Sequence, residues 1–209
     1  MDGITWYKQS GFRLIHEERQ VYIDPWEVPA GEPKADFILI THAHFDHFDK
    51  ETIERLRHAG TKIIAPKDVA RELTGANITG VLPGETHDIA GLKFETVPAY
   101  NIDKEYHPKA KKWVGYVIEI NGHRYYHAGD TDRIPEMTAI ETAVAMLPIG
   151  GTYTMDVDEA VEAVADISPE RAIPMHYGFE VGSKEDGERF QNLAGVPVDL
   201  LEPRIPFEK

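Results

Sequence analysis

Three histidines and two aspartates crowd into one short stretch, directly after an apolar run. The segment "ILITHAHFDHFDK" holds three of the ten histidines in the chain, His42, His44 and His47, together with Asp46 and Asp49. In extended or turn-like backbone, His42 and His44 project to the same side. Asp46 and His47 follow and can serve a second point nearby. Imidazole and carboxylate suit zinc, manganese or iron, so the spacing predicts a metal centre rather than an incidental polar loop.

Two later segments repeat this arrangement. "RYYHAGDTD" is a β-rich run that ends in a loop carrying His127, Asp130 and Asp132, and "RAIPMHYG" places His176 at the end of another apolar run. A lone buried histidine is usually a satisfied core residue, but the shared position at a strand end favours a role for His176 in the same site.

These side chains need rigid elements to position them. "DFILIT" reads as a strand buried on both faces, whose end can hold a loop firmly enough to aim several ligands at one point. Alternating or apolar patterns predict strands at 4–7, 12–15, 20–24, 36–41, 61–65, 93–99, 113–120, 124–128, 143–149, 171–176 and 198–201. Helical spacing predicts helices at 50–60, 66–75, 156–167 and 183–195.

Two local signals sharpen this map. Asn121 and Gly122 lie between two strands and favour a two-residue hairpin turn, since both positions of such a turn need positive φ. Asp156 with Glu159 forms the pattern of a helix capping box. Strands dominate the first third and alternate with helices from residue 134 on, so we expect an α/β (α+β) fold with sheets covered by helices.

Composition restricts the classes of function. The net charge of −14 disfavours binding to nucleic-acid backbones or anionic membranes. The chain has no cysteine, so any metal must be held by histidine and carboxylate. Its first residues lack the pattern of a signal peptide and no stretch matches a membrane span, so we expect a cytoplasmic protein. At 209 residues, we expect a single domain over 1–209.

The motifs "THAHFDH", "AGDTD" and "PMHYG" resemble, in order and spacing, those of the metallo-β-lactamase superfamily. The arrangement is most similar to its small metal-dependent hydrolases related to the L-ascorbate phosphate lactonases. The resemblance runs from "YIDPW" to "PMHYG" and implies a four-layer αββα sandwich. It also implies two divalent metal ions at one edge, zinc or manganese in the first place, with iron and nickel also compatible.

Carried onto this chain, the resemblance assigns each motif residue a role. His42 and His44 would bind the first metal, Asp130 would bridge the two ions, and a further set would bind the second metal: Asp46, His47 and His176. One more histidine is expected on the first metal. His107 is the preferred candidate, whereas Asn101 stands at the matching position and would act through its carbonyl oxygen or from behind the ligands.

Other residues are expected to support the ligands. Asp24 and His127 are candidates for contacts behind the metal-binding side chains, where they would fix the tautomer of a ligand histidine. For Asp24, an ordinary Asp-Pro turn is an almost equal alternative. Many relatives carry histidine near the position of Gln9, so an accessory function there is changed or absent.

A dinuclear site of this type implies hydrolysis, because the metals lower the pKa of bound water and supply hydroxide near neutral pH. Asp130 would bridge and orient, and Asp46 would accept a proton. We expect a small anionic ester, lactone or phosphodiester as substrate. Three lysines and three tyrosines near the motifs are candidates to bind it: Lys109, Lys111, Lys112, Tyr100, Tyr153 and Tyr177. A solvated lysine face is an equal alternative.

Two other functions and one other fold are alternatives to this interpretation. A non-catalytic metal-binding or sensor domain could share the fold, and a nuclease acting on short nucleic acids would also suit two metals. A (β/α)₈ barrel also uses histidine pairs after its first strand, but it needs about 250 residues and regular strand-helix alternation. A homo-oligomer is compatible with the sequence.

Overall fold

Two six-stranded mixed sheets form the framework of the protein. The computed structural model describes residues 3–207. The first sheet has the strand order β1-β2-β3-β4-β5-β6, with β1 to β3 antiparallel and β3 to β6 parallel. Its strands are β1 (Ile4–Lys8), β2 (Gly11–His16), β3 (Arg19–Ile23), β4 (Phe37–Leu39), β5 (Lys62–Pro66) and β6 (Ile78–Val81).

The second sheet repeats this plan. Its strand order is β12-β11-β10-β9-β8-β7, with β7 to β10 antiparallel and β10 to β12 parallel. Its strands are β7 (Thr86–Ile89), β8 (Leu92–Pro98), β9 (Val114–Ile120), β10 (His123–His127), β11 (Val144–Pro148) and β12 (Arg171–Met175).

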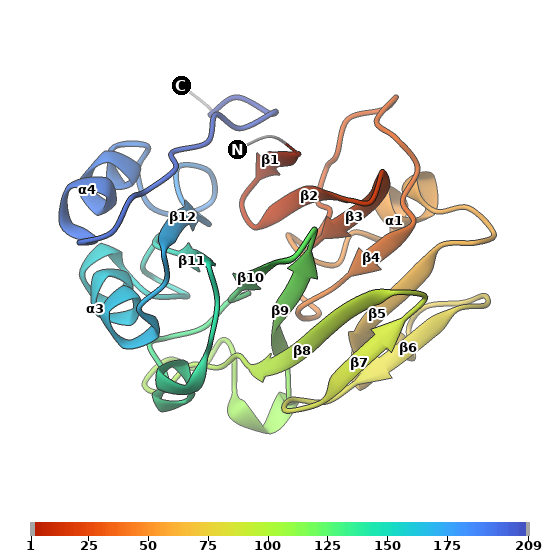
Figure 1. Ribbon diagram of the computed structural model, residues 1–209, viewed down its shortest axis with the longest axis horizontal. Coiled ribbons are helices and arrows are strands. Elements are labelled where there is room, and N and C mark those ends of the chain that lie inside the picture. Colours follow the sequence, from red (N-terminus) through yellow and green to blue (C-terminus); the bar gives the residue numbers. More distant parts are fainter. Residues whose placement is uncertain (1–2, 208–209) are drawn as a thin grey trace.

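Helices cover the outer faces of both sheets (Figure 1). Helices α1 (Lys50–Leu56) and α2 (Lys67–Ala70) belong to the first half of the chain, and α3 (Val157–Ile167) and α4 (Glu185–Leu193) to the second. Two 3₁₀ turns, η1 (Lys109–Lys111) and η2 (Pro135–Ala139), lie in the connections of the second sheet.

Side-chain alternation along the strands separates two hydrophobic clusters. In β4, Phe37 and Leu39 pack into a cluster that joins residues of both sheets and extends to α3 and α4. Ile38, between them, packs with residues of α1 and α2 on the opposite face. Neighbouring residues of a strand point to opposite faces, so apolar side chains fill the space between the sheets and the space under the outer helices, as in the four-layer αββα sandwich that the resemblance implies. The strand "DFILIT" is buried on both faces, as expected.

The predicted local signals are confirmed. Asn121 and Gly122 have φ of 49° and 82° and join β9 to β10. Asp156 caps α3, accepting a hydrogen bond from the backbone N–H of Glu159 while the Glu159 side chain accepts from Asp156 N–H.

Several predicted elements differ in the structure. The helix expected at 66–75 is only the single turn α2, because beyond Ala70 the N–H groups of Glu72 and Leu73 bond to carbonyls three residues back, in a turn and not in a continued α-helix. Strands β6 and β7 were not predicted, since "ITGV" contains a glycine and "THDI" has only one apolar residue; pairing with β5 and β8 holds them in place. The strand expected at 198–201 is reduced to one bridge between Ala172 and Val198.

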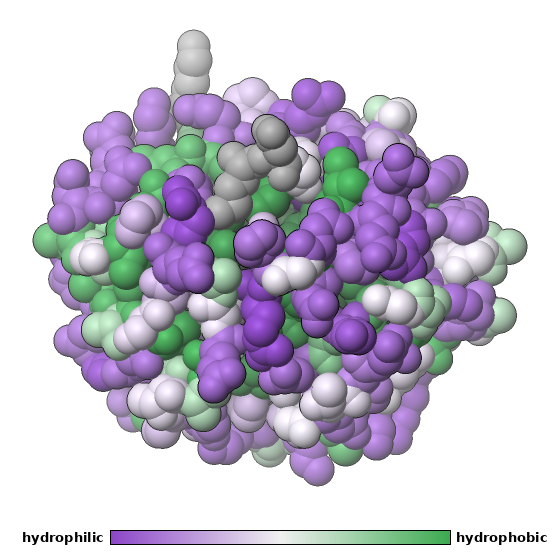
Figure 2. Space-filling view, viewed as in Figure 1, coloured by the Kyte–Doolittle hydropathy of each residue, from purple (hydrophilic) through white to green (hydrophobic). Residues whose placement is uncertain are grey.

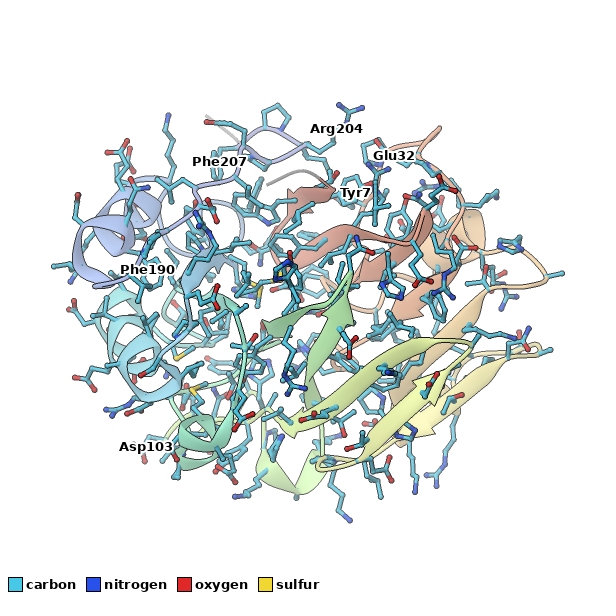
Figure 3. All side chains as sticks on the ribbon, viewed as in Figure 1. Tyr7, Glu32, Asp103, Phe190, Arg204 and Phe207 are labelled. Atoms are coloured by element: carbon cyan, nitrogen blue, oxygen red, sulfur yellow. The ribbon has the colours of Figure 1, made fainter. Side chains whose placement is uncertain are left out.

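The C-terminal segment runs beside β1. Backbone N–H groups of Arg204 and Ile205 donate to the carbonyls of Trp6 and Tyr7. Figure 3 shows Arg204, Glu32 and Tyr7 close together at this edge, where Glu32 accepts hydrogen bonds from Tyr7 and Arg204. These contacts tie down the β1–β2 hairpin that carries Gln9.

Polar and charged side chains cover most of the face seen in Figure 2, with smaller hydrophobic areas between them. Within residues 3–207, no helix is long and apolar enough to cross a bilayer.

Candidate metal centre

Connections at strand ends of both sheets converge on one histidine and aspartate cluster. The loop after β4 carries His42, His44, Asp46 and His47, and other residues follow β10 and β12 or lie between β8 and β9. The sheets are linked close to this cluster, because the Tyr116 hydroxyl donates to Ile40 O at 2.7 Å and Val114 N–H donates to Thr41 O. The loop is therefore anchored by both halves of the fold.

One group of four ligand atoms faces a common point, which we call the first compartment. Its members are His42 Nε2, His44 Nδ1, His107 Nε2 and Asp130 Oδ2. His44 Nδ1 lies 3.1 Å from both His42 Nε2 and His107 Nε2. Asp130 Oδ2 lies 3.2 Å from His107 Nε2 and 3.8 Å from His42 Nε2.

A second group lies on the other side of Asp130, and we call it the second compartment. It consists of Asp46 Oδ2, His47 Nε2 and His176 Nε2, with Asp130 Oδ1 3.3 Å from His47 Nε2. His176 Nε2 is 3.4 Å from Asp46 Oδ2, and His47 Nε2 is 3.6 Å from it. Asp130 Oδ1 therefore faces the second compartment, whereas Asp130 Oδ2, which also lies 3.2 Å from His176 Nε2, stands between the two compartments.

The donor set fits divalent cations. Ligands bonded to one tetrahedral ion at about 2.0–2.2 Å stand roughly 3.3–3.6 Å apart, and the separations above, 3.1–3.8 Å, lie close to that range. Among the described residues, His47 Nε2 and Asp130 Oδ1 are buried and have no hydrogen-bond partner. Orphaned buried polar atoms are rare, and a cation between them would satisfy both.

Asp24 lies directly behind the cluster. Its Oδ2 accepts from the Thr41 hydroxyl at 2.6 Å and lies 2.7 Å from His47 Nδ1, while its Oδ1 accepts from Thr41 N–H. The contact places the His47 proton on Nδ1 and leaves the Nε2 lone pair for a cation. Asp24 is fully buried with a φ of 44°, a conformation that non-glycine residues seldom adopt.

Asn101 takes the corresponding place behind His107. Its Oδ1 lies 2.9 Å from His107 Nδ1 and accepts from His107 N–H, and its amide donates to Asp132 and to Tyr153 O. Of the two candidates for the third histidine position, His107 faces the first compartment and Asn101 supports it from outside. The amide carbonyl holds the His107 tautomer with Nε2 free.

Gln9 reaches the second compartment from the β1–β2 turn. Its Nε2 donates to Asp46 Oδ2 at 3.2 Å and lies 3.4 Å from His176 Nε2. The Gln9 backbone carbonyl accepts from Trp6 Nε1 and His176 N–H. Gln9 is fully buried with a φ of 48°, so the turn holds its amide against the cluster.

The electrostatics of the cluster reflect close opposite charges. Burial lowers the pKa of His176, but Asp130 and Asp46 outweigh it and raise that pKa to about 9. His47 behaves alike, and the carboxylates around it raise its pKa well above the usual value. Burial raises the pKa of Asp46, yet His47 and His176 bring it down to about 2. Burial lowers the pKa of His42 well below its usual value.

A pocket of about 280 Å³ opens over the cluster. Besides cluster residues, the lining includes Phe45, Tyr106, Tyr153 and Glu180. Its volume lies at the lower end of the range of ligand pockets, which favours a small molecule.

Of the six residues expected to bind substrate, only Tyr153 lines this pocket. Lys109 donates to the Tyr100 hydroxyl and to Glu136, both at 3.0 Å. Lys109, Lys112 and Tyr100 line a separate cavity of about 390 Å³. The two lysines lie outside the cluster pocket because the 3₁₀ turn η1 carries the chain away from the cluster directly after His107.

The other two expected residues also lie outside the pocket lining. Lys111 Nζ lies 5.7 Å from the Trp113 ring centroid. Tyr177 is buried and stacks on Trp6 at 5.3 Å.

His127 also differs from expectation. Its Nε2 lies 2.9 Å from Ser10 O, its Nδ1 accepts from Gly129 N–H, and its ring packs edge-on against Phe12. His127 therefore fastens β10 to the β1–β2 turn and makes no hydrogen bond to a cluster residue among those described.

The comparisons with known proteins agree with this fold and cluster. A profile of the beta-lactamase superfamily domain matches residues 3–176. The chain therefore belongs to the beta-lactamase superfamily.

Relatives of similar length carry the name metal-dependent hydrolase. The UPF0173 metal-dependent hydrolase of Thermococcus onnurineus is 34% identical over 217 residues, covering 96% of each chain. The crystal structure of a candidate metal-dependent hydrolase from Parabacteroides distasonis has a TM-score of 0.86 and 33% identity, covering 96% of this chain and 92% of that one. Igni18, a metallo hydrolase from Ignicoccus hospitalis, has a TM-score of 0.77 and 29% identity, covering 96% and 94%.

Proposed function

We propose that the protein is a dinuclear metal-dependent hydrolase acting on a small ester, lactone or phosphodiester. The class, metal-dependent hydrolase, is that of its curated relatives. The observation that carries the dinuclear proposal is Asp130, whose carboxylate stands between two groups of ligand atoms, with Oδ2 3.2 Å from both His107 Nε2 and His176 Nε2. Zinc or manganese suits these ligands best, and iron or nickel would also fit.

Each compartment has its own ligands. His42, His44 and His107 would hold one cation and Asp46, His47 and His176 the other, with Asp130 between them. When bound, the two cations supply Lewis-acid polarisation of the scissile bond and lower the pKa of water.

Asp46 is the cluster carboxylate best placed to act on the attacking water. It lines the pocket, and Gln9 holds its Oδ2 by a hydrogen bond. Because neighbouring histidines keep the pKa of Asp46 at about 2, it stays ionised at neutral pH. A carboxylate in that state orients a water by accepting its hydrogen bond, and it takes up a proton only transiently.

Tyr153 is the remaining candidate for contact with the developing charge. Its side chain lines the pocket, and its backbone carbonyl accepts from Asn101 Nδ2 at 2.9 Å. The Tyr153 hydroxyl would donate to a developing oxyanion, a role that Tyr153→Phe would remove with little change in packing.

The test is turnover of a panel of esters, lactones and phosphodiesters by protein loaded with zinc or manganese, by chelated protein, and by an Asp46→Asn variant. We expect chelation to abolish hydrolysis, metal to restore it, and Asp46→Asn to lower kcat by about 10²-fold or more. Asp103→Asn, at an exposed position, is the control. Turnover that survives chelation, or that Asp46→Asn leaves unchanged, would refute the proposal.

The same panel separates the competing functions. A non-catalytic sensor would bind metal and hydrolyse none of the substrates. A nuclease for short nucleic acids would favour dinucleotides, although Glu180 at the pocket and the absence of lysine or arginine from its lining residues disfavour a polyanion.

A further inference from the structure

Three aromatic side chains line the pocket beside the cluster. They are Phe45, Tyr106 and Tyr153, which we call the aromatic wall. Phe45 lies between His44 and Asp46 in the chain, and Tyr106 directly precedes His107. The wall is therefore built from the same loops that carry the candidate metal ligands.

Two of the three wall residues are exposed although they are hydrophobic, and Tyr153 is half-buried. The exposed fraction is 66% for Phe45 and 48% for Tyr106. Apolar surface costs about 25 cal/mol per Å² when it is left in water, and exposed apolar groups beside polar ones mark binding sites. Among the described residues, the large exposed hydrophobic side chains also include Ile102, in the same loop as Tyr106, and Leu193 on α4.

Neighbouring side chains hold the wall in position. The Phe45 ring packs edge-on against Trp26 at 5.6 Å, and the Trp26 ring is buried under Lys8 Nζ at 3.8 Å. Tyr106 packs edge-on against Tyr153 at 4.6 Å. A preformed apolar surface of this kind binds without a large ordering cost.

The pocket lining contains three acidic side chains and no lysine or arginine. Glu180 is exposed and lines the pocket together with Asp46 and Asp130, and no lysine or arginine is among its lining residues. Two divalent cations would more than offset the two aspartates, which leaves Glu180 as a negative charge beside the aromatic wall. An anionic oxygen is therefore favoured at the cations, whereas an anionic group placed beside Glu180 is repelled.

We propose that the pocket selects substrates in which an uncharged or cationic aromatic group lies next to the hydrolysed bond, with the aromatic wall binding the ring and Glu180 disfavouring an anionic substituent on it. This inference rests on the proposed function and adds the substrate class. It departs from the expectation of lysine-bound anions, since those lysines lie elsewhere.

Equilibrium binding to zinc-loaded protein tests the proposal without depending on which bond is hydrolysed. Methylphosphonate and phenylphosphonate carry the same metal-binding group and differ in the ring, and 4-carboxyphenylphosphonate adds an anion. By calorimetry, we expect phenylphosphonate to bind about tenfold or more tightly than methylphosphonate, as burial of a ring implies, and the carboxylated compound to lose most of that gain.

Variants assign these effects to residues. Phe45→Leu and Tyr106→Leu should reduce the ratio of phenylphosphonate to methylphosphonate affinity severalfold, and Glu180→Gln should restore binding of 4-carboxyphenylphosphonate. Leu193→Ala, an exposed hydrophobic position outside the pocket lining, is the control and should keep the wild-type ratio. Elemental analysis of each variant checks that it keeps its zinc content.

The outcomes are distinct. Equal binding of methylphosphonate and phenylphosphonate would overturn the inference and leave the proposed function standing. Protein that takes up no zinc and binds none of the three phosphonates would refute the metal centre and the inference with it. A phenyl preference that survives both leucine variants would place the ring elsewhere and overturn the assignment to the aromatic wall.

Discussion

Substitution of Asp24 by asparagine should weaken metal binding although Asp24 touches no cation in the proposed arrangement. Asp24 Oδ2 lies against the Thr41 hydroxyl and His47 Nδ1. In the asparagine variant, the side-chain NH₂ group would either take the place of Oδ2 or face the Thr41 N–H group. In either orientation, one of the contacts that the carboxylate makes with Thr41 and His47 is lost. If the amide faces His47 Nδ1, the proton moves to Nε2, where the second compartment needs a lone pair.

The size of the effect follows from the contacts. Loss of a partner behind a metal-binding histidine typically costs 10- to 100-fold in metal affinity, or about 1.4–2.7 kcal/mol. Asparagine also tolerates the left-handed backbone conformation of Asp24 better than most residues do, so the metal-free protein should still fold. We therefore expect weaker zinc affinity in a folded variant.

Competition with a chelator of known affinity measures this change, and circular dichroism checks the fold. Asp103→Asn makes the same change of charge at an exposed position and is the control. Zinc affinity of Asp24→Asn within twofold of wild type would refute the reasoning on the His47 tautomer.

Three further predictions concern the same cluster. Asn101→Ala should weaken zinc affinity in chelator competition, but less than His107→Ala, which removes a proposed ligand; equal losses would contradict the assignment of His107. Gly150→Ala should destabilise the fold in denaturant titrations, because a Cβ there would stand 2.1 Å from His176 O; unchanged stability would contradict it. Metal-free protein should lose on the order of 1–3 kcal/mol of unfolding free energy between pH 6.5 and 9, because the pKa values of His47 and His176 are raised in the folded protein. The stabilisation is complete below about pH 6.5, the pKa of an unfolded histidine, and is lost as the pH rises through the folded-state pKa values; a flat profile would contradict this prediction.

The sequence was informative where residue type and strand position coincide. The segment from His42 to His47 follows a strand that is apolar on both faces, so its burial and its rigid placement could be expected from periodicity. Asp49, two residues after His47, has a local structural role, because its side chain caps α1. Clusters of ionisable groups at strand ends are thus visible without coordinates.

The pocket lining was not visible in the same way. Lys109 and Lys112 follow His107 closely, but a 3₁₀ turn and a left-handed Lys112 direct them into another cavity. Phe45 and Tyr106 look like core residues by type, and only the tertiary structure shows that they are exposed. Glu180 gives no signal in the sequence, since an exposed glutamate is ordinary.

Elemental analysis of protein purified without added metal or chelator, and of the same protein after reconstitution with zinc or manganese, tests the central claim most directly. Wild type and Asp130→Ala should be compared, because Asp130 contacts ligand atoms of both compartments. We predict about two metal ions per wild-type chain, as two ligand groups imply, and fewer in Asp130→Ala. Wild-type protein that holds no metal after reconstitution, or an Asp130→Ala variant that keeps the full content, would contradict the dinuclear centre.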